Sequence, residues 1–427
     1  MIFLITSIFI LGYAAIALEH PLKVNKAATA LMTAALCWGI FSLLMTDKEH
    51  VVEFLGEHLG EVSGILFFLL GAMTIVELID AHDGFEIVTN RIKTADKRKL
   101  IWILSFITFF LSAVLDNLTT TIVIVSLLRK LIADKKERLL FAGMVIIAAN
   151  AGGAWSPIGD VTTTMLWIRG QITVGGIVLD AFLPSLICLL APLFLISRQM
   201  KGEVKRPPVL EKNTNYTTSA VERNTVFWLG VGSLVFVPVF KTVTHLPPYM
   251  GILFGLGLMW IITEIIHSGK DEEEKGQLSV NHALRKVDVP SVLFFLGILL
   301  SIGALQATGV LDDLAGFLNT HIGNINIITM TIGLLSAIVD NVPLVAAAQG
   351  MYSMDMFPTD HYFWKFLAYC AGTGGSALII GSAAGVAAMG LEKIEFFWYM
   401  KKISWLALVG YLAGAGVFML QQMLFHG

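Results

Sequence analysis

Charge is scarce in this chain. Asp, Glu, Lys and Arg together make up 14% of its 427 residues, whereas hydrophobic residues make up 56%. Soluble domains carry about a quarter charged residues, so a soluble globular protein is excluded. Many apolar runs approach the roughly 20 residues that a helix needs to cross a bilayer. The sequence therefore predicts a polytopic membrane protein that is surrounded by lipid and has no nucleic-acid partner.

Cysteine is also rare, with only Cys37, Cys188 and Cys370 in the whole chain. Each lies inside an apolar run, which argues against a disulfide framework or a metal cluster and favours a packing role. We expect no cofactor. No Lys or Arg precedes the first apolar run, so we expect a retained first span rather than a secretory signal peptide.

Ten apolar segments have the length of membrane spans. They cover residues 2–18, 27–45, 62–81, 140–168, 174–197, 224–241, 248–267, 290–308, 363–391 and 398–424. Two further apolar segments, 100–130 and 325–350, are interrupted at their centres by Asp-Asn pairs. These pairs are Asp116-Asn117 and Asp340-Asn341.

The interrupted segments differ in the charge of their flanks. Lys and Arg cluster on both sides of 100–130, and the positive-inside rule places both flanks in the cytoplasm. This segment should enter the membrane and return as a re-entrant hairpin with Asp116 at its tip. The flanks of 325–350 contain neither Lys nor Arg, which predicts a hairpin that enters from the opposite side with Asp340 at its tip.

The two halves of the chain repeat one pattern. Ser-Ala-Val-Leu-Asp-Asn at 112–117 matches Ser-Ala-Ile-Val-Asp-Asn at 336–341, and both halves contain Gly-Gly followed by Gly six residues later. Each half has five spans and one hairpin, and two odd-numbered units in one chain must be inverted. We predict an all-α fold of two inverted repeats with interrupted helices at the midplane. The repeats are residues 1–198 and 224–427, joined by a cytoplasmic linker, 199–223.

The segments 140–168 and 363–391 contain the helix breaks. Glycine and proline disfavour a continuous helix there, and a break in lipid is tolerated where it lines a cavity. Polar side chains gather at the first break and the first hairpin tip: Asn150, Asp160, Thr162, Thr163, Asp116, Asn117, Thr119 and Thr120. They offer oxygen atoms without Arg, Lys or His, which suits a hard cation. A buried carboxylate lowers its cost by binding a cation or a proton, so this pattern predicts cation/proton exchange.

At these residues the chain resembles the NhaD-type sodium/proton antiporters of the ion-transporter superfamily. The likeness is most specific in ANAGGAWSPIGDVTTTMLW at 149–167. It implies a homodimer in the cell inner (plasma) membrane that exchanges Na+ and Li+ for H+ by an elevator movement. Carried over by position, the ion site would draw on Asp116, Asn117, Asn150, Asp160, Thr162, Thr163, Asp340 and Asn341, supported by Ser112, Ser336 and Ser376.

Other interpretations stay open. The aspartates are good helix caps, and capping alone would explain them without transport. An anion/sodium symporter or a metalloid exporter of the same fold is the alternative transporter. An intramembrane hydrolase with Asp116 and Asp340 as a dyad is a third possibility, although we expect no enzyme. His82 is interpreted as part of a solvated helix end or, alternatively, of a pH sensor, and His267 as an interfacial residue.

Overall fold

The computed structural model describes residues 2–89, 92–207, 218–338 and 340–425. Part of the predicted linker, residues 208–217, lies outside this set, as does Val339 at the second hairpin tip. Within it the chain is helical, and the only β pairing is an isolated bridge between Asp96 and Glu203. Eight of the described helices are long and apolar enough to cross a membrane. The all-α, polytopic fold class is therefore confirmed.

The helices follow one another through short connections. In the first half they are α1 (Ile2–Ala17), α2 (Glu19–Leu22), α3 (Lys26–Leu44), α4 (Lys48–Ala81), α5 (Glu86–Thr89), α6 (Lys97–Leu115), α7 (Asn117–Leu131), α8 (Lys135–Gly153), α9 (Val161–Ile168) and α10 (Val174–Ser197). In the second half they are α11 (Ala220–Thr244), α12 (Pro248–Ile266), α13 (Glu272–Gln277), α14 (Val280–Lys286), α15 (Val289–Ala307), α16 (Val310–His321), α17 (Ile325–Leu335), α18 (Asn341–Met351), α19 (Tyr362–Gly374), η1 (Gly375–Ala377), α20 (Ala383–Glu392), α21 (Phe396–Lys402) and α22 (Ser404–Phe425).

Short polar side chains begin many of these helices. Asp96 accepts a hydrogen bond from the backbone at the start of α6, and Asp134 does so for α8. Ser219 and Glu222 form a reciprocal capping box at the start of α11. Because the first amides of a helix have no partner inside the helix, such caps define where the apolar helices begin.

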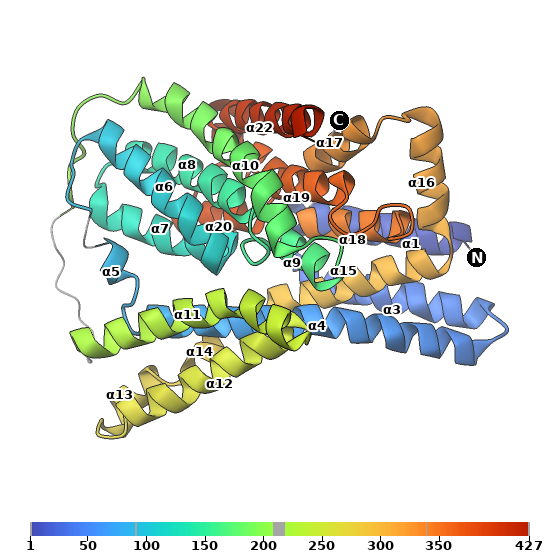
Figure 1. Cartoon of the computed structure of the whole chain (residues 1–427), viewed down its shortest axis with the longest axis horizontal. Helices are drawn as coiled ribbons and strands as arrows, with labels where there is room; N and C mark the ends of the chain where they lie inside the picture. The colour runs from blue at the N-terminus through green and yellow to red at the C-terminus, as the bar shows by residue number, and fades with distance from the viewer. Residues whose placement is uncertain (1, 90–91, 208–217, 339, 426–427) are drawn as a thin grey trace.

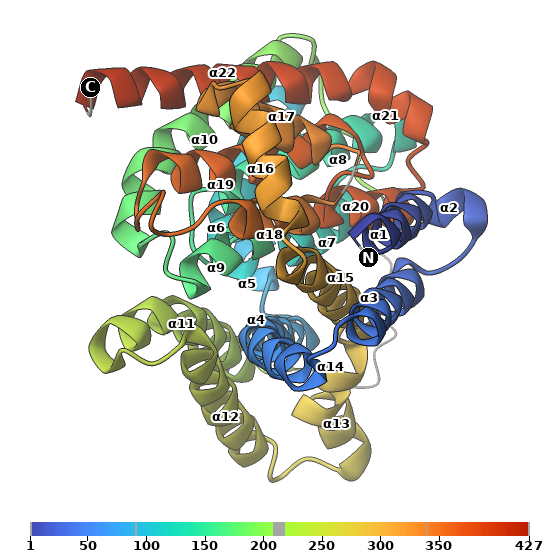
Figure 2. The ribbon, with the colours of Figure 1, turned by 90° about the vertical axis from the view of Figure 1, so that its right-hand side faces the viewer.

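The helices form two groups that lie side by side (Figures 1 and 2). In one group α3 packs on α15, and α4 packs on α11, α12 and α15. In the other, α8 packs on α6 and α7, α19 packs on α17, and α10 packs on α22. Contacts between α15 and α18, α4 and α9, and α6 and α11 join the groups. The broken helices and both helix pairs with Asp-Asn turns belong to the second group.

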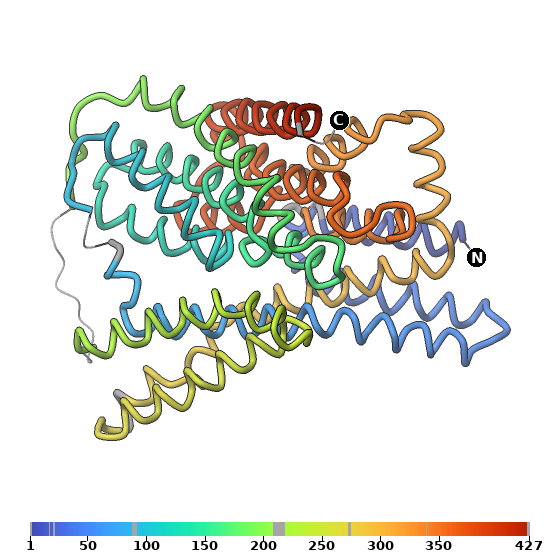
Figure 3. The backbone as a smooth tube through the Cα atoms, in the orientation of Figure 1, coloured from blue at the N-terminus to red at the C-terminus, as the bar shows by residue number. Residues whose placement is uncertain are grey.

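Two helices differ from the predicted spans. The span predicted at 62–81 is the second part of α4, a helix of 34 residues that runs without interruption along the molecule (Figure 3). No proline occurs between its ends, so it extends to about 50 Å, well beyond the roughly 30 Å of a bilayer core. The span predicted at 398–424 is divided into α21 and α22.

Candidate ion-binding site

The polar centre of the molecule lies where α8 and α19 are interrupted. α8 ends at Gly153 and α9 begins at Val161, so seven residues separate the two helices. A Cβ atom on Gly153 would lie 2.3 Å from the carbonyl oxygen of Gly159. A Cβ atom on Gly152 would lie 2.1 Å from the carbonyl oxygen of Phe109 in α6. Glycine is required here because backbone packs directly against backbone.

The second half has the same contacts at the corresponding residues. A Cβ atom on Gly375 would lie 2.5 Å from the carbonyl oxygen of Gly381, and one on Gly374 would lie 2.0 Å from that of Gly333 in α17. Ser112 donates to the carbonyl of Ala149 at 2.6 Å, and Ser336 donates to that of Ala371 at 3.2 Å. These two serines hold the Asp-Asn turns against α8 and α19.

Asp160 is the buried carboxylate at the first break, with 1% of its surface exposed. Its Oδ1 accepts from the backbone amide of Thr162 at 2.8 Å and from the Thr162 hydroxyl at 2.5 Å. Its Oδ2 accepts from Asn117 Nδ2 at 2.5 Å. Asn341 Nδ2 lies 3.4 Å from Oδ1. One carboxylate therefore caps α9 and contacts both Asp-Asn turns.

Asn150 extends this network into the second break. It accepts from Asn117 Nδ2 at 3.0 Å, and its own Nδ2 donates to the hydroxyls of Ser376 at 2.8 Å and Ser382 at 2.9 Å. All of these side chains are buried. Ser382 begins α20 and occupies the place that Asp160 occupies before α9.

Asp116 lies at the first Asp-Asn turn, between α6 and α7. Its Oδ1 accepts from the Thr119 amide and its Oδ2 accepts from the Thr119 hydroxyl, both at 2.8 Å. Asp116 has φ 108°. Residues other than glycine rarely adopt this backbone conformation, which costs about 1–3 kcal/mol. Such strain occurs where the surrounding structure must hold a functional group in position.

Asp340 lies at the second turn and has a partner that the sequence did not suggest. Lys26, at the start of α3, places its Nζ 3.4 Å from Asp340 Oδ2. The same ammonium group lies 4.4 Å from the centre of the Phe294 ring. Asp340 also caps α18 through the amide of Val342. Among the described residues, its neighbour Asn341 connects it to the Asp160 network.

Three hydroxyl groups near the network have no partner among the described residues. They belong to Thr120 and Thr121 in α7 and to Thr163 in α9, and each is fully buried. A buried hydroxyl without a partner costs about 1–3 kcal/mol. Buried oxygen atoms without a hydrogen-bond partner can coordinate a desolvated hard cation as a substrate. No three His, Cys, Asp or Glu side chains in the described part of the chain converge as a transition-metal site would require.

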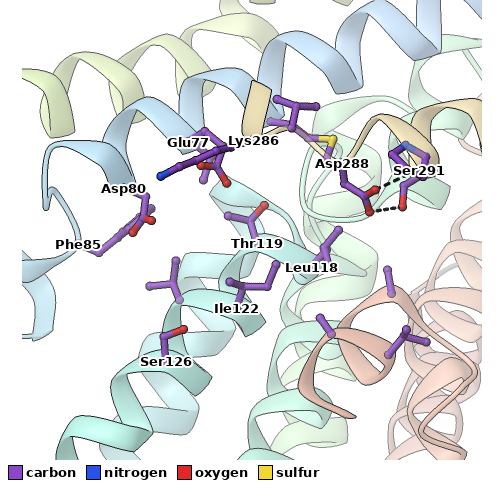
Figure 4. Close-up of a pocket in the computed structure, with 18 of the residues that line it drawn as sticks. Glu77, Asp80, Phe85, Leu118, Thr119, Ile122, Ser126, Lys286, Asp288 and Ser291 are labelled. Atoms are coloured by element: carbon purple, nitrogen blue, oxygen red, sulfur yellow. Dashed lines mark hydrogen bonds between the residues drawn. The ribbon is translucent and has the colours of Figure 1, made fainter. Parts of the chain in front are cut away.

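A cavity of about 500 Å³ reaches the first turn from one end of the molecule. Figure 4 shows Thr119 in its wall, facing the side where Glu77 and Lys286 lie. Six acidic and three basic side chains line this cavity, and Lys26 is one of the three. The excess of negative charge favours cations inside it.

His82 and His267 were not expected to meet. They follow the last residues of α4 and α12, are 0% and 2% exposed, and stack with ring centres 5.0 Å apart. Their Nε2 atoms are 3.3 Å apart, and His82 Nδ1–H donates to the carbonyl of Leu78. The solvated position expected for His82 is wrong for its side chain, because the two rings cover each other, and the interfacial position of His267 stays a prediction. Neither histidine belongs to a pattern that signals its partner 185 residues away.

The fold and the oxygen-rich centre define a membrane transporter, and comparison with known proteins gives its family. A family model described as a citrate transporter matches residues 9–364. A sodium/proton antiporter 1 of Arabidopsis thaliana is 51% identical over 96% of this chain and 71% of that protein. The Na+/H+ antiporter NhaD of Alkalimonas amylolytica is 29% identical over 99% of this chain and 92% of that protein.

The chain thus belongs to the citrate transporter family of membrane transporters, within its NhaD-type antiporter group. A solved structure of similar fold is the Alcanivorax borkumensis YdaH transporter, which is described as having an unusual topology. The TM-score is 0.60 with 9% identity, and the match covers 92% of this chain and 96% of that one. This likeness concerns the fold alone. The protein is a multi-pass integral membrane protein.

Proposed function

We propose that this protein exchanges Na+, and also Li+, for H+ across the membrane. The observation that carries the proposal is the position of Asp160, a buried carboxylate that joins both helix breaks and both Asp-Asn turns through neutral amides and hydroxyls. A carboxylate in such surroundings is costly when it is charged and alone. It lowers that cost by binding either a cation or a proton.

Competition for the same oxygens couples the two ions. A cation at Asp160 displaces the proton, and a proton weakens cation binding, so the site carries one or the other across. Asp116, which accepts a hydrogen bond from the Thr119 hydroxyl, is the second acid of the site. The unpartnered hydroxyl of Thr163 is a further ligand for the desolvated cation.

The movement that we propose is an elevator in which the group with the broken helices slides against the group that contains α3, α4 and α15. The support is the small set of contacts that joins the groups and the matched glycine contacts of the two halves. These matched contacts also support an inverted repeat. From the basic residues at the ends of α6, α7 and α8 we infer that the 500 Å³ cavity opens to the cytoplasmic side. The homodimer is proposed from the resemblance to NhaD-type antiporters.

Proton flux in proteoliposomes tests this function. A pH gradient is imposed, and Na+, Li+, K+ and Ca2+ are added in turn to the wild type, to Asp116→Asn and to Asp312→Asn, which alters an exposed acid of α16. We expect Na+ and Li+ to collapse the gradient in the wild type and in Asp312→Asn but not in Asp116→Asn. Transport of labelled citrate or arsenite, with no cation-dependent proton movement, would overturn the proposal and leave the fold unchanged.

A further inference from the structure

A second cavity, of about 650 Å³, lies away from the ion site, between the beginning of α8, the end of α10, α21 with the residues before it, and the beginning of α22. Five lysines line it: Lys135, Lys136, Lys393, Lys401 and Lys402. Among the residues that the structure describes, Glu395 is the only acidic side chain in its wall. All five lysines are exposed, and none of them forms an ion pair with another described residue. The described wall of the cavity therefore carries a strong excess of positive charge.

This cavity also has the features of a membrane interface. Trp398 and Trp405 line it together with aliphatic side chains of α8, α10 and α22. α21 is short, has two lysines in its last turn, and exposes Phe397 at 67% and Met400 at 40%. Tryptophan and lysine at the end of an apolar helix mark the headgroup level of a bilayer. Figure 2 shows α21 at the end of α22, next to α8.

We propose that this cavity binds the phosphodiester headgroup of an anionic membrane lipid. The lysines supply the positive charge, the tryptophans sit at headgroup depth, and the aliphatic wall accommodates the beginning of the acyl chains. Basic pockets between membrane helices on the cytoplasmic side are suited to anionic headgroups, and this end of the molecule carries the basic loops. A free phosphate ion would use the lysines but not the apolar wall.

The lipid site is connected to the polar centre through α21. Tyr399, between Trp398 and the lysines, is 1% exposed and donates its hydroxyl to the carbonyl of Ser376 at 2.9 Å. Ser376 accepts in turn from Asn150 at 2.8 Å. A headgroup that binds between α21 and α8 therefore stabilises the conformation of the second helix break through Tyr399 and Ser376.

Lipid retention measured by native mass spectrometry tests this site. The purified protein is mixed with phosphatidylglycerol, phosphatidylcholine or inorganic phosphate. We expect the wild type to retain phosphatidylglycerol at least about tenfold more than phosphatidylcholine, with an unfolding temperature that rises on binding. K135Q/K401Q/K402Q should lose most of this preference, and K135R/K401R/K402R should keep it because arginine also binds phosphate.

The matched control K23Q/K99Q/K205Q removes the same number of charges outside the cavity and should retain lipid like the wild type. Equal retention by the glutamine variant and the wild type, or an equal loss in the control, would overturn the proposal. So would displacement of phosphatidylglycerol by millimolar inorganic phosphate, which would identify the ligand as a free anion. The assay measures lipid binding alone, so its outcome is independent of cation transport.

Discussion

Replacement of Asp160 by serine separates helix capping from ion binding. Asp160 has φ −147° and ψ 143°, and Ser382, at the corresponding place in the second break, has φ −147° and ψ 153°. Ser382 caps α20 with its hydroxyl, so a serine at 160 is expected to fit the backbone and to cap α9. Asn117 loses Oδ2 as an acceptor but keeps Asn150.

The structure allows the two costs of this change to be compared. The fold loses the hydrogen bonds that the Thr162 hydroxyl, Asn117 and Asn341 donate to the carboxylate, each of which contributes about 1.5–3 kcal/mol. This loss is offset because the change also removes a charged carboxylate from the membrane interior, where it is costly. Cation binding loses a unit charge. Two unit charges 4 Å apart attract each other by about 4 kcal/mol at an effective dielectric constant near 20, which corresponds to roughly a thousandfold in affinity. Binding of the ion should therefore suffer more than folding.

The assay is Na+-dependent proton flux in proteoliposomes, with the unfolding temperature measured in parallel. We expect Asp160→Ser to fold, with a modest fall in unfolding temperature, and to show no saturable Na+ response in the range where the wild type saturates. Asp312→Asn should match the wild type in both measurements. If Asp160→Ser transports Na+ with the wild-type KM, then Asp160 is only a helix cap and the reasoning fails.

Three further outcomes follow from the geometry. Gly153→Ala places a Cβ atom 2.3 Å from the Gly159 carbonyl, so it should destabilise the protein by about 1–3 kcal/mol and abolish exchange. Lys26→Gln removes the ammonium group beside Asp340, which repels a cation at the same turn, so the KM for Na+ should fall by about threefold or more, while Lys26→Arg should keep the wild-type KM. Burial, together with the neighbouring histidine and lysine, lowers the pKa of His267 from 6.5 to about 4. The folded protein then keeps this ring neutral while the unfolded chain binds a proton, so stability should fall as the pH drops from about 6.5 to about 4, and His267→Phe should weaken that dependence.

Each outcome has its own control. Gly175→Ala, at a position with open space around the new Cβ atom, should leave stability and exchange unchanged, and equal behaviour of the two alanine variants would contradict the packing argument. Lys23→Gln should keep the wild-type KM for Na+. An unchanged acid sensitivity of unfolding in His267→Phe would show that the histidine pair does not contribute. Thermal unfolding monitored by tryptophan fluorescence across pH 4–8 measures this last effect.

Sequence alone determined the class of the protein and the chemistry of its centre. The apolar runs require a membrane because exposing so much apolar surface to water is unfavourable. The Asp-Asn pairs and the Gly-Gly breaks mark where helices end, since capping and glycine flexibility act over a few residues. These are short-range effects. In the structure α8 and α19 end at Gly153 and Gly374, and α7 and α18 begin directly after Asp116 and Asp340.

Tertiary structure decided which of these residues meet. Asn150 reaches Ser376 and Ser382 across more than 220 residues of sequence, and Lys26 reaches Asp340 across 314. The same packing stacks His82 on His267. No local pattern encodes such pairs, because they depend on the relative placement of whole helices, which is decided by how their apolar surfaces and glycine contacts fit together. The sequence therefore determined which groups are present, and the packing of the two halves decided which of them share one site.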